Sequence, residues 1–189
     1  SKSIQEIVFA AYTNHPPGME GGFEATHYYD PPNLTFPSGA YICVVDIDPE
    51  TCHINVRRFV AIDDCGNIIN PMIVQGQVHG GLTQGLAPAM YEELIYDEAG
   101  NILNGTFMDY LVPTAVESPN WETGHTVTPS PHHPIGAKGV GESPTVGAPP
   151  AIVNAIVDAV QHLGVKHLEI PVTPFKLYKE LKAVGYFDE

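Results

Sequence analysis

A loop in the last third of the chain places one carboxylate among several glycines. Residues 136–144 read GAKGVGESP, so that Glu142 follows three glycines and one lysine. Glycine is favoured where the backbone needs a positive φ or must come close to another group. A carboxylate at such a place can take up a proton from a reacting molecule. We therefore interpret Glu142 as a candidate catalytic base.

The same carboxylate has an ordinary structural interpretation, which the glycine spacing leaves open. An acid at the start of a helix interacts with the helix dipole, and this contributes a few tenths to about 1 kcal/mol. Two other site classes are not supported. The run Gly139 to Gly141 lacks the third glycine of a dinucleotide fingerprint and the Walker pattern. Residues 141–145 end in threonine where the serine-hydrolase elbow requires glycine.

A second glycine cluster lies upstream, inside a predicted helix. Asn70 and Pro71 are typical of an N-cap and first helical position, and Pro88 should end or kink the helix. Four glycines lie between them, and each costs about 0.8–1 kcal/mol relative to alanine. They are Gly76, Gly80, Gly81 and Gly85. We infer that another group approaches this bare backbone closely, beside the polar side chain of Gln77.

The remaining patterns predict the elements that position these residues. A capping box predicts a helix over about 4–12, followed by a long ordered loop with one short strand near 27–29. Runs 41–48 and 53–62 predict an antiparallel hairpin, and a second hairpin is expected around 97–101. Pro149-Pro150 should open a buried helix that stops at Gly164, and a last helix should span 174–184. The fold class is therefore α+β, with antiparallel hairpins packed with helices.

Alternation in the second strand predicts which of its faces is buried. Ile54, Val56, Val60 and Ile62 share one face, whereas Phe59 points the other way with polar neighbours. We expect the first of these faces to join the core.

Composition excludes several classes of partner. The 189 residues hold 8 Lys and Arg against 22 Asp and Glu, a net charge of −14, which would repel nucleic acid and anionic membranes. Three cysteines without a C-x-x-C pair favour neither a disulfide framework nor a zinc site, and suit a reducing cytoplasm. No transmembrane segment or signal peptide is recognised. The adjacent His132 and His133 lack an acid or cysteine at ligand spacing, so no metal site is expected there.

The two glycine-rich segments together resemble a known family. GAKGVGESP is similar to the glutamate loop of molybdenum hydroxylases, and CGNIINP (65–71) with GQVHGG (76–81) is similar to their cofactor-contacting segment. The phrases AYTN (11–14), YDPPN (29–33) and TPSPHHP (128–134) resemble the carbon monoxide dehydrogenases within the xanthine dehydrogenase/aldehyde oxidase superfamily. The resemblance implies that residues 1–189 are the C-terminal portion of a molybdopterin-binding domain, a fragment of a longer subunit.

The resemblance also implies roles for individual residues. Glu142 would be the catalytic base, and the amide of Gln77 would contact the molybdenum centre. A further group would line the cofactor: Gly80, Gly81, Lys138, Gly139, Val140, Gly141, Cys65, Gly66 and Asn70. Other interpretations stay open, because a buried cysteine is usually a small hydrophobic residue, and Asn70 also suits a simple helix cap.

For the whole enzyme, the resemblance implies oxidation of CO to CO₂ with water as the oxygen source. The cofactor would be molybdopterin cytosine dinucleotide, with copper present in the parent enzyme. Electrons would pass to an iron–sulfur (2Fe–2S) small subunit and an FAD-binding medium subunit, in a cytoplasmic dimer of heterotrimers that could associate with the inner face of the membrane. Alternatives are an aldehyde- or N-heterocycle-oxidising hydroxylase and a cofactor-binding module without activity of its own.

Overall fold

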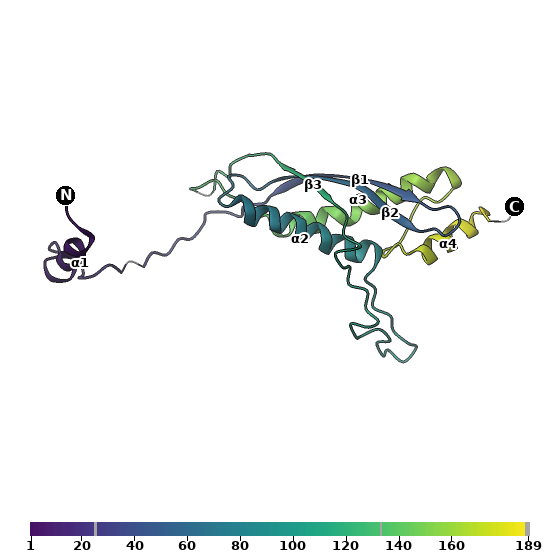
Figure 1. Cartoon of the computed structure of the whole chain (residues 1–189), viewed down its shortest axis with the longest axis horizontal. Coiled ribbons are helices and arrows are strands. Elements are labelled where there is room, and N and C mark those ends of the chain that lie inside the picture. The colour runs from purple at the N-terminus through teal and green to yellow at the C-terminus, as the bar shows by residue number, and fades with distance from the viewer. Residues whose placement is uncertain (25, 133, 188–189) are drawn as a thin grey trace. The chain divides into compact units, whose positions relative to one another are not determined.

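The computed structural model describes residues 1–24, 26–132 and 134–187 and divides into two units, Ser1–Pro32 and Asn33–Glu189. The first unit contains α1 (Ile4–Thr13), drawn in purple in Figure 1. The Glu6 N–H donates to the Ser3 side chain at 3.2 Å, and the Ser3 N–H donates to the Glu6 carboxylate at 2.7 Å. The capping box is thus confirmed. The strand expected near 27–29 is wrong, because these residues pair with no other strand in the described part of the chain.

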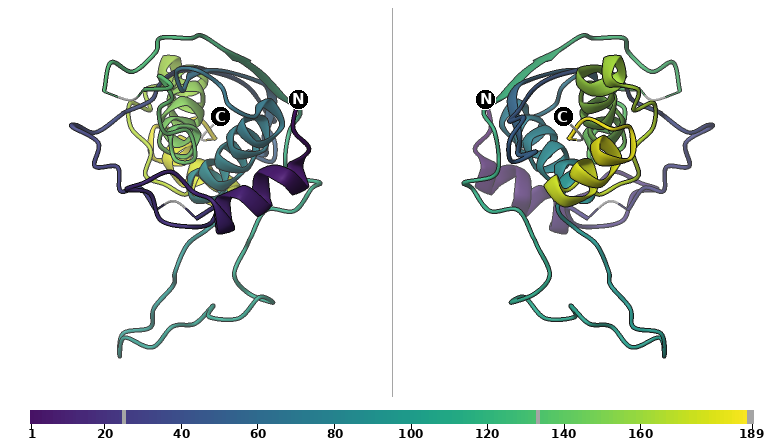
Figure 2. Two further views of the ribbon diagram at one scale, coloured as in Figure 1. Left: turned by 90° about the vertical axis from the view of Figure 1, so that its left-hand side faces the viewer. Right: turned by 90° about the vertical axis from the view of Figure 1, so that its right-hand side faces the viewer.

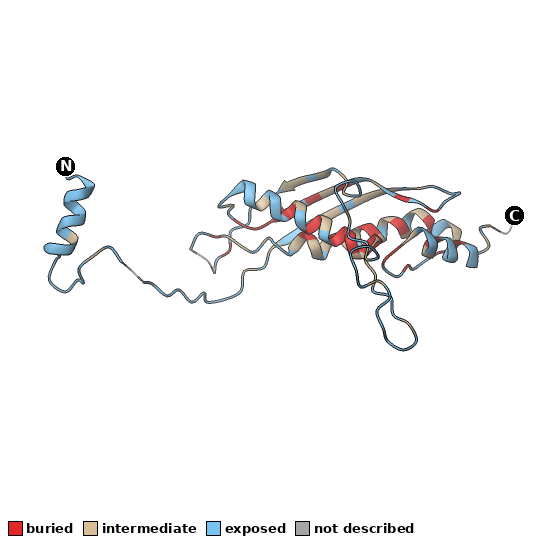
Figure 3. Cartoon of the chain, turned by 60° about the horizontal axis from the view of Figure 1, so that its bottom comes forward, coloured by how far each residue is buried: buried red, intermediate tan, exposed pale blue. Residues whose placement is uncertain are grey.

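The second unit is a three-stranded sheet with two long helices against one face (Figures 1 and 2). Its elements are β1 (Ser38–Ile47), β2 (Ile54–Asp64), α2 (Pro71–Met90), β3 (Trp121–His125), α3 (Ser143–Val160), a 3₁₀ turn η1 (Gln161–Leu163) and α4 (Pro174–Ala183). Buried residues line the sides of α2 and α3 that meet each other and the sheet (Figure 3). The α+β class is confirmed.

Among the described residues, no helix combines the length and apolar character needed to span a bilayer.

The β1–β2 hairpin is confirmed, but the predicted core face of β2 is only half right. Val44 pairs with Arg58 and Val45 with Val56, so that Arg57 is an extra residue in a β-bulge. A bulge shifts the alternation by one position. Beyond it, Phe59 and Ala61 turn inward and are fully buried. Ile62, which the regular alternation placed in the core, is 37% exposed.

The third strand was not predicted from the sequence. β3 pairs in parallel with β2, from Phe59 opposite Trp121 to Asp63 opposite His125. Its sequence, WETGH, contains a glycine and no run of β-branched residues, so strand propensity gives little signal. Arg58 clamps Glu122 with two hydrogen bonds of 2.6 and 2.7 Å on the exposed face. Parallel pairing depends on contacts distant in sequence, which local patterns do not report.

The helix assigned to Pro149-Pro150 begins earlier than expected. α3 starts at Ser143, and both prolines lie inside it. Pro149 has no N–H, so the Thr145 carbonyl loses its usual helical donor. This stretch packs against Gly85 of α2, where an added Cβ would lie 3.0 Å from that carbonyl and from Pro149. Close helix packing offsets the cost of the prolines, so the prediction placed the helix start too late.

The C-terminal elements agree closely with the sequence. Gly164 adopts φ +106° and ends η1, as expected of a glycine stop. Thr173 caps α4 by accepting a hydrogen bond from the Lys176 N–H at 3.2 Å. The second hairpin is reduced to a single bridge between Tyr96 and Ile102.

Alanine substitution at two glycines of α2, Gly85 and Gly76, should change the free energy of unfolding in opposite directions. We expect Gly85→Ala to lower the free energy of unfolding by about 1–3 kcal/mol, because its Cβ would lie 2.8 Å from the Cβ of Ala148. Gly76 faces open space, so Gly76→Ala should raise helix stability by up to about 1 kcal/mol. Equilibrium urea denaturation measures both. Equal effects of the two substitutions would contradict the described packing.

Candidate functional site

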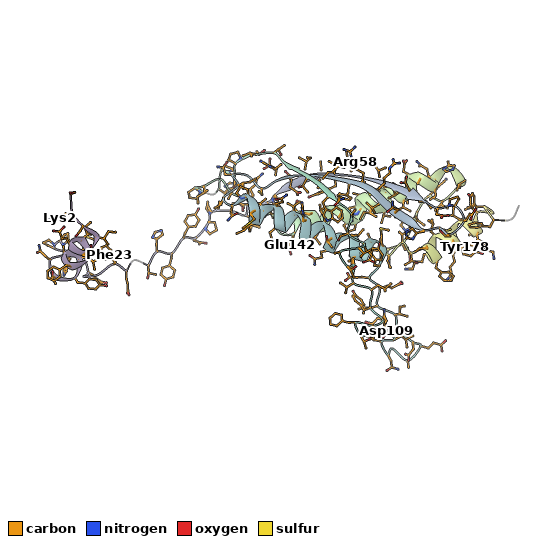
Figure 4. All side chains as sticks on the ribbon, viewed as in Figure 1. Lys2, Phe23, Arg58, Asp109, Glu142 and Tyr178 are labelled. Carbon is orange, nitrogen blue, oxygen red and sulfur yellow. The ribbon has the colours of Figure 1, made fainter. Side chains whose placement is uncertain are left out.

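Glu142 occupies the N-cap position of α3 but makes no capping hydrogen bond with its side chain. The residue is labelled in Figure 4. It lines an open groove of about 670 Å³ between the start of β1 and the first turns of α3. The groove is lined by Phe36, Pro37, Ser38, Gly39, Tyr41, Glu142, Ser143, Val146, Gly147, Pro150, Ala151 and Asn154. The Glu142 carboxylate therefore lies at the start of a helix, as expected of an acid that interacts with the helix dipole. It is also exposed at the groove, where it can act on a bound molecule.

A buried hydrogen-bond network fixes the residue next to Glu142. Ser143 Oγ donates to Asp63 Oδ1 at 2.8 Å, and the Tyr41 hydroxyl donates to the same oxygen. Burial and the bond to Asp63 raise the pKa of Tyr41 well above its ordinary value, so it stays a neutral donor. Asp63 is only 2% exposed, and its Oδ2 has no partner among the described residues. One carboxylate thus ties β2 to the start of α3.

A second buried carboxylate fixes the loop that leads to Glu142. Asp64 accepts from Lys138 Nζ at 2.9 Å, from the hydroxyls of Thr126 and Thr128 at 3.0 and 2.7 Å, and from the Gly66 N–H at 3.0 Å. The bonds from Thr128 and then Lys138 hold the pKa of Asp64 well below its usual range. The ammonium group expected near the cofactor is thus engaged in a nearly buried ion pair.

The backbone of the loop is partly engaged as well. The Lys138 N–H donates to the Cys65 carbonyl at 2.7 Å, and the Gly139 N–H donates to the Thr35 carbonyl at 3.3 Å. The next three N–H groups, at residues 140–142, have no partner among the described residues. Of the N–H donors expected to contact the cofactor, those of Val140 and Gly141 therefore remain available.

Gln77 of α2 lies beside the glycine loop. A Cβ added at Gly141 would lie 3.0 Å from Gln77 Oε1, so the side-chain amide is beside the loop. Gly80 faces open space. Gly81 does not, because its α-carbon faces Pro144 and Thr145 of α3, where an added Cβ would lie 3.1 Å from each side chain. The close approach inferred at Gly81 is to a helix of the same chain.

Cys65, Gly66 and Asn70 have structural roles that the structure makes explicit. Cys65 is buried, which raises the pKa of its thiol, and it lines a cavity of about 230 Å³ with Asp63 and His125. Gly66 has φ +67° and contacts the Gly136 carbonyl so closely that no side chain fits there. Asn70 caps α2 by accepting from the Ile73 N–H at 3.2 Å.

Sequence reasoning missed the two acids that organise the site, Asp63 and Asp64. The available signal was their position at the end of a β-branched strand, immediately before Cys65-Gly66, where two adjacent buried acids are unusual. The His132 N–H donates to the Ser130 hydroxyl at 3.2 Å, and His133 lies outside the described residues. In the described part of the chain, no cluster of three or more His, Cys, Asp or Glu side chains could hold a metal.

The hydrogen bonds and ion pair of Asp64 should make the stability of the fold depend on pH. Because its pKa is lowered on folding, the carboxylate stabilises the fold above the unfolded pKa of about 3.9, and this contribution is lost as pH falls below that value. We expect Asp64→Asn to lower the unfolding temperature at pH about 7 and to flatten its decline between pH about 5 and 2. Asp46→Asn, which removes the exposed pair with Arg57, is the control. An unchanged acid profile in Asp64→Asn would contradict the assigned role.

Comparisons with known proteins identify the family of the chain. Residues 1–119 match the model of the molybdopterin cofactor-binding domain. The chain is 59% identical over 181 residues to the carbon monoxide dehydrogenase large chain of Hydrogenophaga pseudoflava, covering 96% of this chain and 22% of that protein.

Two solved structures extend the comparison. A Cu,Mo-CO dehydrogenase matches with a TM-score of 0.91 and 54% identity, over 98% of this chain and 23% of that one. Quinoline 2-oxidoreductase from Pseudomonas putida 86 matches with a TM-score of 0.88 and 43% identity, over 94% and 23%. The chain thus spans less than a quarter of the length of these relatives.

The fold and these matches define a cofactor-binding domain of the xanthine dehydrogenase/aldehyde oxidase superfamily. The chain belongs to the molybdopterin cofactor-binding domain family.

Proposed function

We propose that this chain supplies the glutamate side of the active site in a molybdenum enzyme that oxidises CO to CO₂. The observation that carries the proposal is the exposed Glu142 carboxylate, held at the groove by the fixed Ser143 and adjoining Gln77 through Gly141. The high identity to carbon monoxide dehydrogenase large chains supports the choice of substrate.

The residues present fit a molybdopterin group. The N–H groups of residues 140–142, which have no partner among the described residues, and the N-terminus of α3 suit an anionic ligand. Gly80 offers open backbone beside Gln77. Asp63, whose buried Oδ2 has no partner among the described residues, lines the same cavity as Cys65. We therefore propose Gln77, Gly80, Val140, Gly141 and Cys65 as cofactor contacts.

The other residues that the resemblance placed at the cofactor act indirectly, by holding the loop and the neighbouring helices in place. Lys138 and Gly139 hold the loop through their contacts with Asp64 and Thr35. Gly66 and Asn70 determine the conformation of the segment before α2, and Gly81 allows α3 to pack closely against α2. Glu142 and the N–H donors can reach a ligand only if these contacts keep the loop in place.

In the reaction CO + H₂O → CO₂ + 2H⁺ + 2e⁻, the chain's own side chains handle protons and orientation. When bound, the cofactor would supply the redox centre for the two electrons. Glu142 takes up one proton at its carboxylate and returns it to water. The Gln77 amide orients the reacting group by donating a hydrogen bond. The neutral Tyr41 and Ser143 donate hydrogen bonds to Asp63, and these bonds hold the start of α3 against β2.

The whole assembly is also proposed from the relatives. Residues 1–189 would form the C-terminal portion of the domain, and the remaining large subunit would complete the pocket. Molybdopterin cytosine dinucleotide would be the cofactor, and copper would be present, as the name of the similar Cu,Mo enzyme suggests. An FAD subunit and an iron–sulfur subunit would receive the electrons, in a cytoplasmic dimer of heterotrimers.

A second candidate function is hydroxylation of an N-heterocycle. The likeness to quinoline 2-oxidoreductase, at 43% identity, favours this reaction over the oxidation of aldehydes. The same glutamate would serve as base in either case.

Substrate assays on the purified complete complex decide between CO oxidation and N-heterocycle hydroxylation. We expect reduction of an artificial acceptor with CO, and loss of this activity when cyanide removes reactive sulfur. Turnover of quinoline without CO oxidation would exclude the first function and favour the second, whereas turnover of aldehydes alone would exclude both. Molybdenum and cytidine contents provide the control for cofactor loading.

A further inference from the structure

Residues 92–117, here called the arm, leave the body of the second unit between the end of α2 and the start of β3. The arm projects away from the layered sheet and helices in every view (Figures 1 and 2). None of the site residues described above lies in it, so its exposed surface needs a separate explanation.

Local hydrogen bonds give the arm a defined shape. The Leu103 N–H donates to the Ile95 carbonyl at 2.8 Å, and Asp97 accepts from the Asn101 N–H at 2.8 Å. Farther along, the Thr106 hydroxyl donates to Asp109 at 2.7 Å. The turns thus satisfy their own polar groups, which distinguishes the arm from a flexible linker.

The arm is anchored at its base. Lys176 of α4 forms a 2.7 Å ion pair with Glu93, and Ser118, just past the arm, lies within hydrogen-bond distance of Thr83 on α2. The outer part has no such contact with the body among the described residues.

The outer part presents large apolar side chains to solvent. Phe107 is 95% exposed and Met108 is 91% exposed. Phe107 also lines a hollow of about 500 Å³ with Leu94 and Ile102, and grouped exposed apolar side chains mark interaction sites. Aromatic residues and methionine are also the types enriched at protein interfaces.

The charge of the arm is one-sided. It contains six acidic residues and no lysine or arginine. The acids are Glu92, Glu93, Asp97, Glu98, Asp109 and Glu117. A partner surface must therefore combine an apolar cleft with a basic rim, because like charges across an interface are strongly unfavourable.

We propose that the arm is a docking element for a separate polypeptide, which receives Phe107 and Met108 in an apolar cleft bordered by lysine or arginine. A second copy of this chain is a poor partner. Its net charge is −14, and of its eight basic residues, four already form ion pairs with acids of the same chain in the described residues. The proposal does not depend on the reaction that the enzyme catalyses.

The test uses the full-length subunit and the chains that co-purify with it. We expect Phe107→Ser/Met108→Ser to weaken binding of one co-purifying chain by about tenfold or more, as for hot-spot residues. Glu98→Lys should also weaken it and should reduce its sensitivity to salt. Ile42→Ser, at a 65% exposed position on β1, is the matched control. Unchanged affinity in both arm variants would overturn the proposal.

Hydrogen exchange tests the same contact without mutation. Amides of residues 92–117 should exchange more slowly in the assembled complex than in the isolated full-length subunit. Equal protection in the isolated subunit would show that its own chain covers the arm, and would overturn the proposal. Equally fast exchange in both states would overturn it as well.

Discussion

Replacing Glu142 by glutamine is expected to lower turnover of the complete enzyme by about 10²–10⁴, the usual contribution of a general base. Glutamine keeps the size of the side chain and its ability to accept a hydrogen bond, but it cannot take up a proton at neutral pH. Because Glu142 makes no capping bond, the substitution should leave α3 and the groove intact. Steady-state rates on the complex, together with its molybdenum content, provide the measurement.

Glu169→Gln is the matched control for this prediction, since Glu169 is exposed and lies outside the groove. The control should retain the parent rate. A Glu142→Gln enzyme that is fully loaded with cofactor and turns over at the parent rate would exclude Glu142 as the base.

Truncating Phe59 to alanine should have the largest effect on stability, about 3–5 kcal/mol. Phe59 is fully buried, and its ring packs edge-on against Trp121 at a centroid distance of 5.3 Å. Removing it opens a cavity where β2, β3 and the helices meet. Urea denaturation of the purified protein, monitored by circular dichroism, measures the loss.

The comparison with Ile62→Ala tests the bulge directly. Ile62 is on the partly exposed face, so its truncation should cost much less than that of Phe59, on the order of 1 kcal/mol or below. If instead Ile62→Ala were the more damaging substitution, regular alternation would hold through β2 and the bulge at Arg57 would be wrong.

Sequence patterns predicted the elements whose signals are local. The capping box at Ser3, the Asn70-Pro71 helix start and the β1–β2 hairpin are each specified by neighbouring residues, and all three are confirmed. The errors arose where distant contacts decide the outcome. The bulge at Arg57 depends on pairing with β1, and the start of α3 depends on packing against α2.

The candidate site divides in the same way. The family phrases led to Glu142 and Gln77, and the structure places Gln77 of α2 beside Gly141, the residue before Glu142. They did not reveal the ion pair of Lys138 with Asp64, since Asp64 lies at the end of β2, far from Lys138 in the sequence. Asp63 was missed for a related reason. Regular alternation placed it on the exposed face of β2, whereas the bulge turns its side chain into the core.

The parallel pairing of β2 with β3 has a consequence for how the chain folds. The two strands meet only after the whole segment containing α2 and the arm has been closed into a loop, so this contact should form late and should slow folding. Closure entropy depends weakly on loop length, and halving the loop changes it by only about 0.6 kcal/mol. The arm could therefore lengthen or shorten during evolution with little effect on the stability of the sheet beneath it.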